Sequence, residues 1–205
     1  MWSLVLVQLE NSKAALLNNN KELAKEIRRK EKIIDALELK IDADCEYFIA
    51  LYAPKAMDMR LVLSIINISV GLERIADFTN GIAKYILKDD REQLDSTLIT
   101  EIEIEKMFNE LISMLNNCFV AFENEDVSRS NEIIAQDDEI DRIYYKSPDI
   151  LAKYVQNKPE IARETLRFMV ILKKLERIGD HCSNIMEELV FYVDANVLKH
   201  KTEKM

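Results

Sequence analysis

The motif LERIAD at residues 72–77 recurs 103 positions later as LERIGD at residues 175–180. Both copies lie in segments where apolar residues recur at alternating spacings of four and three. This pattern is typical of a helix that packs along its length against near-parallel neighbours. The repeated motif therefore predicts two equivalent long helices, which we expect at residues 56–87 and 160–195.

The duplication extends to the segments that precede these two helices. Residues 20–52 align with residues 127–156 at an offset of 106, which places Ile34 on Ile140. The same offset sets Met1 opposite the middle of a further helical segment, so we expect the first copy to have a shortened first helix. Two copies of a three-helix unit are the simplest interpretation, each burying its own apolar stripe.

The composition favours helices throughout the chain. Only 3 Gly and 3 Pro occur in 205 residues, which is too few for the many tight turns of an all-β protein. We expect an all-α fold of two tandem antiparallel three-helix bundles, at residues 1–92 and 93–205. The predicted helices are 1–17, 20–52, 56–87, 95–122, 127–156 and 160–195.

Charge and hydropathy exclude several classes of function. The net charge of -9 opposes binding to nucleic acid, and it disfavours direct capture of phosphate unless bound cations reverse the local sign. The longest uncharged runs, such as residues 61–72, are too short to cross a bilayer. Nucleotide-binding and nucleophile motifs are absent from the sequence. We expect a cytoplasmic protein, not an enzyme, that meets the membrane only through its partners.

Pairs of acidic residues spaced four apart recur on the duplicated helices. On a helix this spacing is about one turn, so both carboxylates of a pair lie on one face. Measured against the apolar stripes, these faces point out of the bundles. Carboxylates from two neighbouring helices supply the oxygen ligands that magnesium, manganese or iron prefer. The candidate metal ligands are Glu31, Asp35, Glu73, Asp77, Asp137, Asp141, Glu176 and Asp180.

Two structural alternatives to a metal site stay open at this point. Arg74 and Arg177 follow the first acid of their pairs directly, and Arg60 and Arg163 lie on the same helices. Internal ion pairs could therefore neutralise the acids without a metal. An acidic chain also produces such pairs by chance, so the protein could be a metal-free helical adaptor with a solvated or partner-binding acidic face.

The duplicated LERI motifs, the four acidic pairs and the arginine before each Glu-Arg step resemble the PhoU family over essentially the whole chain. The resemblance implies two antiparallel three-helix bundles with multinuclear metal clusters on outer helical faces. The eight acids named above would hold divalent or trivalent ions such as iron, zinc, manganese or magnesium. The resemblance also implies a regulator that holds the phosphate-starvation response off, acting with the phosphate ABC transporter (Pst) and the sensor kinase PhoR, and a possible homodimer.

Two departures limit what the resemblance transfers. The first copy has Phe78 where the second has His181, and Gly81 where the second has Asn184, so the two sites are expected to be unequal. PhoU-like domains also occur as cytoplasmic tails of sodium/phosphate cotransporters. Such a tail is the alternative assignment, and it would change the partner while leaving the fold and the acidic faces unaltered.

Overall fold

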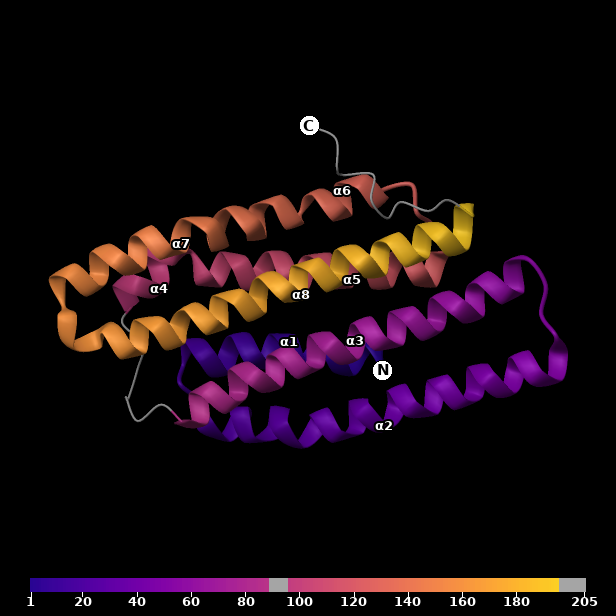
Figure 1. The fold of residues 1–205 in the computed structure, drawn as a ribbon, viewed down its shortest axis with the longest axis horizontal. Coiled ribbons are helices and arrows are strands. Elements are labelled where there is room, and N and C mark those ends of the chain that lie inside the picture. The colour runs from indigo at the N-terminus through magenta and orange to yellow at the C-terminus, as the bar shows by residue number, and fades with distance from the viewer. Residues whose placement is uncertain (89–95, 196–205) are drawn as a thin grey trace.

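The computed structural model describes residues 1–88 and 96–195. Within these ranges the secondary structure is helical, with α-helices and one short 3-10 turn (Figure 1). The first bundle consists of α1 (Trp2–Leu17), α2 (Lys21–Tyr52) and α3 (Met57–Lys88). The second consists of α4 (Ser96–Ile102), α5 (Ile104–Asn124), α6 (Ser130–Ala135), α7 (Asp137–Asn157), η1 (Pro159–Ile161) and α8 (Ala162–Asp194).

This arrangement confirms the predicted all-α fold of two tandem antiparallel three-helix bundles (Figure 1). Local chemistry sets the helix ends. The Asn20 side chain accepts a hydrogen bond from the Leu23 amide at 3.0 Å and caps α2, as expected for an asparagine N-cap. Ala53 then ends α2 in the left-handed conformation. The predicted domain boundary between residues 92 and 93 lies outside the described residues.

Two predicted helices of the second bundle are each divided. The segment predicted at 95–122 breaks at Glu103, whose φ of 64° is left-handed. The Glu103 amide donates to the Thr100 carbonyl, which tightens the last turn of α4 and ends it. The segment predicted at 127–156 divides at Gln136, whose amide donates to the Ile133 carbonyl in the same tighter pattern. Both breaks occur without Gly or Pro, so the sequence carries no signal for them.

Helices α3 and α8 form the centre of the molecule, where they pack against each other in opposite directions (Figure 1). The Phe78 and His181 rings lie 5.7 Å apart at this contact, and they occupy equivalent positions of the two copies. The approximate twofold axis that relates the copies therefore passes near these two rings. Small buried residues such as Ala76 and Ala83 give α3 a second buried face beside its apolar stripe.

One contiguous core runs through both bundles. Ile75 and Ile178, equivalent residues of the two copies, are both fully buried in it. In the described ranges, no helix has an apolar stretch long enough to span a membrane.

Candidate metal centres

The second bundle holds four of the predicted acids between α7 and α8. Asp137 and Asp141 lie on α7, and Glu176 and Asp180 lie on α8. Glu176 is only 6% exposed. Asp137 Oδ2 accepts a hydrogen bond from the Ser183 hydroxyl at 3.2 Å, which fixes this carboxylate against α8. The two acidic pairs therefore face each other across one helix contact.

Gly179 explains the one difference between the two repeated motifs. A Cβ atom at this position would collide with Asp137 Oδ1, so glycine is what lets the Asp137 carboxylate reach the α8 backbone. The first copy has Ala76 at the equivalent position and the longer acid Glu31 in place of Asp137. The short acid thus occurs with the glycine, and the long acid with the alanine.

The acids of the second bundle lack sufficient neutralising partners. Asp137 Oδ1 and Glu176 Oε2 are buried and accept no hydrogen bond. Burial, with the negative charges of Asp141 and Asp180, raises the pKa of Asp137 to about 7. Burial also raises the pKa values of Asp141 and Asp180, and the Glu176 charge adds to both. Lys173 forms an ion pair with Glu176, whereas the other three acids form no ion pair within residues 1–88 and 96–195.

The first bundle repeats the arrangement between α2 and α3. Asn80 donates to Glu31 Oε1 at 2.7 Å, and Asn80 is the positional equivalent of Ser183. Burial raises the pKa of Glu73, and the charges of Asp77 and Asp35 add to that shift. In both copies, therefore, a polar residue on the last helix holds the first acid of the preceding helix.

Glu38 joins the first cluster, although the sequence analysis omitted it. Its negative charge contributes to the raised pKa of Glu73. The signal was available, because Glu38 follows Glu31 by seven residues and so lies on the same helical face. Asn80 and Ser183 follow the acids Glu73 and Glu176 by the same interval.

The outward orientation expected for the acids is wrong for Glu176, which is buried. The other seven acids are partly exposed, and none of them is fully exposed. The reason is that each acidic face is turned toward the other acidic helix of its bundle, where neighbouring side chains cover it. Among the described residues, no three Asp, Glu, His or Cys side chains converge closely enough to ligate one ion. The clusters are opposed pairs of carboxylates and not closed cages.

Among the described residues, the arginines form few of the ion pairs that the ion-pair alternative requires. Arg60 donates from Nε to the Tyr192 carbonyl at 3.4 Å and so bridges α3 to the end of α8. Arg74 approaches Glu73 at 3.7 Å, and its side chain is 57% exposed. Arg177 forms no ion pair within the ranges that the structure describes. Internal ion pairing is therefore a weak substitute for a cation here.

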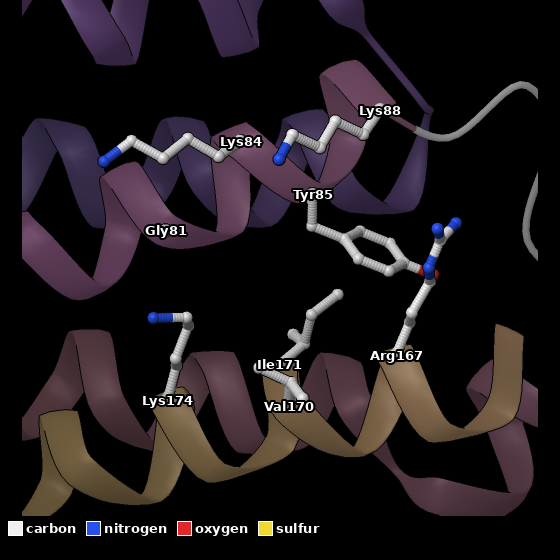
Figure 2. Close-up of a pocket in the computed structure, with 8 residues that line it drawn as sticks. All are labelled: Gly81, Lys84, Tyr85, Lys88, Arg167, Val170, Ile171 and Lys174. Carbon is white, nitrogen blue, oxygen red and sulfur yellow. The ribbon is translucent and has the colours of Figure 1, made fainter. Parts of the chain in front are cut away.

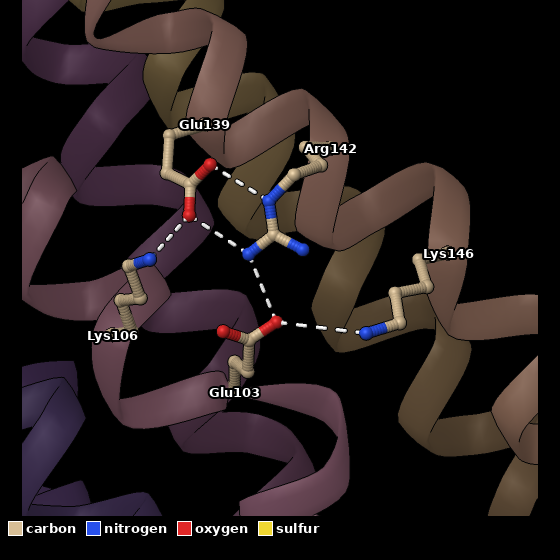
Figure 3. A network of polar contacts seen from close by, with 5 residues as sticks. All are labelled: Glu103, Lys106, Glu139, Arg142 and Lys146. Atoms are coloured by element: carbon tan, nitrogen blue, oxygen red, sulfur yellow. Dashed lines mark hydrogen bonds and ion pairs between the residues drawn. The ribbon is translucent and has the colours of Figure 1, made fainter.

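A separate polar network braces the outer side of the second cluster (Figure 3). Arg142 donates to Glu139 at 2.7 Å and to Glu103 at 2.9 Å, and Lys106 pairs with Glu139. Lys146 lies 4.0 Å from Glu103. The hydrogen bonds from Arg142 and Lys106 lower the pKa of Glu139 to about 2. The network ties the break at Glu103 to the first turns of α7, which carry Asp137 and Asp141.

Comparisons with known proteins agree with this architecture. The family model for the PhoU domain matches the chain twice, at residues 1–86 and 104–189. The phosphate-specific transport system accessory protein PhoU homologue of Zymomonas mobilis is 33% identical over 98% of this chain and 84% of its own length. The PhoU accessory protein of Escherichia coli is 29% identical over 98% of this chain and 82% of its own length.

Solved structures are similar over almost the whole chain. The crystal structure of PhoU from Pseudomonas aeruginosa has a TM-score of 0.85 and 27% identity, covering 96% of this chain and 93% of its own. The phosphate transport system regulatory protein PhoU from Streptococcus pneumoniae has a TM-score of 0.86 and 29% identity, covering 96% and 91%. These relatives are named as accessory or regulatory proteins and not as enzymes. The chain belongs to the PhoU family.

Proposed function

We propose that this protein is a metal-binding negative regulator of phosphate uptake. In this proposal it acts as an accessory protein of the phosphate ABC transporter (Pst) and holds the sensor kinase PhoR in its repressing state when phosphate is plentiful. The names of the relatives support the transport role. The facing acidic pairs support the metal-binding role.

The main support for the metal proposal is that two buried carboxylate oxygens of the second cluster have no hydrogen-bond donor. Asp137 Oδ1 and Glu176 Oε2 are buried without a hydrogen-bond donor, and an uncompensated buried carboxylate is costly. A cation between α7 and α8 would neutralise this charge. Iron, zinc, manganese and magnesium all accept carboxylate oxygens, so the donor set fits each of them.

The two clusters would bind cations with different strengths. In the second, Lys173 already pairs with Glu176 and competes with a metal for that carboxylate. In the first, the only cation within ion-pair distance of a cluster acid among the described residues is the exposed Arg74. Metal ions held by such opposed pairs of carboxylates would keep open coordination positions, because the protein would supply few ligands to each. Those positions could accept an acidic side chain of a partner or a phosphate group.

The test is complementation of a deletion strain that carries a reporter of the phosphate-starvation response. We expect the wild-type gene to restore repression in high phosphate, and the variants Glu73→Ala/Asp77→Ala and Glu176→Ala/Asp180→Ala to restore less of it. The matched control is Asp149→Asn/Glu160→Gln, which removes the same charge from exposed positions of the second bundle. Full repression by both cluster variants would contradict a role for the clusters. Unchanged regulation in the deletion strain itself would contradict the proposed function.

A further inference from the structure

A groove with a cationic rim lies between the end of α3 and the start of α8 (Figure 2). Its volume is about 300 Å³. Lys84 and Lys88 line it from α3, along which their side chains run, and Arg167 and Lys174 rise toward α3 from the facing side of α8 (Figure 2). The α3 pair and the α8 pair are separated by 79 or more positions in the sequence, and the antiparallel contact of the two central helices brings them together.

The four cations lack acidic partners among the residues that the structure describes. Within the parts of the chain that the structure describes, none of them forms an ion pair with a carboxylate. Lys174 Nζ lies 5.6 Å from the centroid of the Phe78 ring, and a Cβ atom at Gly81 would come within 2.5 Å of it. Gly81 therefore provides the space that holds this ammonium group at the α3 backbone. Four cations that have no carboxylate partner in the described ranges form a strong local exception in a chain of net charge -9.

The equivalent place in the other half of the molecule is built differently. There the start of α3 meets the end of α8, and the counterparts of Arg167 and Lys174 are Ser64 and Gly71. The Ser64 hydroxyl donates to the Glu188 carbonyl at 3.2 Å, and Asn67 donates to the Glu188 carboxylate at 3.0 Å. Arg60 also donates to the Tyr192 carbonyl at this end, and the counterparts of Lys84 and Lys88 are Glu187 and Phe191, so the four cations of the groove are not repeated there. The duplicated fold therefore does not require the four cations of the groove. This difference indicates that these cations have a separate function.

We propose that this groove binds an organic polyphosphate of the nucleoside diphosphate or triphosphate class. Four cations match a ligand with about three or four negative charges, because charge-assisted bonds to phosphate oxygens are stronger than neutral ones. The floor is apolar, lined by the exposed Val170 and the buried Ile171, and suits the ring of a nucleoside. A volume of about 300 Å³ fits a small ligand, whereas a nucleic acid or membrane would need a broader basic surface.

The inference is independent of the metal proposal, and the experiment keeps the two apart. Titration calorimetry with ADP and with ATP is done on the full chain in buffer containing EDTA, so that no cation at the carboxylate clusters can bridge to a phosphate. We expect one binding event per chain. Lys84→Ala/Lys88→Ala and Arg167→Ala/Lys174→Ala should each weaken binding by about tenfold or more, as expected for the loss of charged donors.

Two further variants separate the groove from general charge. Val170→Glu places a carboxylate on the groove floor at a residue that is 57% exposed, so it should abolish binding without loss of core packing. Lys40→Ala/Lys153→Ala removes two exposed cations elsewhere and should leave the affinity unchanged. Thermal unfolding of each variant checks that the fold is retained. Equal loss in the control and in the groove variants would overturn the proposal.

Other ligands with the same phosphate chemistry are tested in parallel. Inorganic phosphate should bind more weakly than ADP, because it carries less charge and no ring. Inorganic phosphate binding as tightly as ADP would overturn the assignment to an organic polyphosphate. Sedimentation with phosphatidylglycerol vesicles that is lost in Arg167→Ala/Lys174→Ala, without binding of ADP or ATP, would overturn it in favour of a lipid surface.

Discussion

The two bundles build the same acidic contact from different residues. The first combines Glu31, Ala76 and Asn80, whereas the second combines Asp137, Gly179 and Ser183. The differences compensate one another, because the shorter acid needs a helix backbone without a Cβ atom in its way. The geometry of the contact has therefore been kept while the residues that produce it have changed. This is what we expect of two sites with one purpose.

The surroundings of the two contacts are not equivalent. The network around Arg142 braces only the second bundle, since the positions equivalent to Glu139 and Arg142 in the first are Ile33 and Ala36. Ile33 is 52% exposed. Lys173, which pairs with Glu176, is replaced by Val70 in the first bundle. The two bundles therefore share a core and an acidic contact, but they differ in the charged residues that surround this contact.

The largest expected effect tests whether the two cores are equivalent. Ile75→Ala and Ile178→Ala each create a cavity at a fully buried site, so each should lower the free energy of unfolding by about 2–5 kcal/mol. Urea denaturation measures both values. A large effect from one substitution and almost none from the other would show that the two copies do not share a common packing arrangement.

The next effect concerns the residues that hold the first acid of each cluster. Asn80→Ala and Ser183→Ala should each weaken metal binding at their own cluster by about tenfold to a hundredfold, because they remove the donor that orients a ligand. The effect of Asn80→Ala should be larger, since its bond is shorter. Metal titration monitored by calorimetry measures both affinities. Unaltered affinity in both variants would mean that these bonds do not position ligands.

A smaller effect distinguishes Gly179 from Ala76. Gly179→Ala should displace the Asp137 carboxylate and weaken metal binding at the second cluster, whereas Ala76→Gly should leave the first cluster unaltered. The stability of Gly179→Ala without metal should change little, because alanine favours the helix by about 1 kcal/mol and offsets part of the displacement. Metal titration and thermal unfolding of both variants check this pairing. Equal metal affinity in Gly179→Ala and wild type would contradict it.

The smallest effect concerns the network that only the second bundle has. Arg142→Ala leaves Glu103 and Glu139 without their shared donor, so the melting temperature should fall slightly at low salt. The difference from wild type should vanish in high salt. A shift that persists at high salt would show that Arg142 acts through packing and not through charge.

The sequence was sufficient to predict the repeat, the helices and the acidic pairs, because these depend on periodicity along one helix. It did not predict contacts between helices that are distant in the chain. The burial of Glu176 and the cationic groove both arise from the register in which helices meet, and one helix alone does not determine that register. The left-handed break at Glu103 also escaped prediction, because neither Gly nor Pro marks it.

The most direct test of the metal centres is elemental analysis of protein purified without chelator. The wild type should retain metal, and Glu73→Ala/Asp77→Ala and Glu176→Ala/Asp180→Ala should each lose the metal of one cluster and keep that of the other. Both variants should stay folded, and their stability without metal should stay level or rise, since carboxylates that repel one another are removed. Metal-free wild type, or full metal content in both variants, would contradict the assignment.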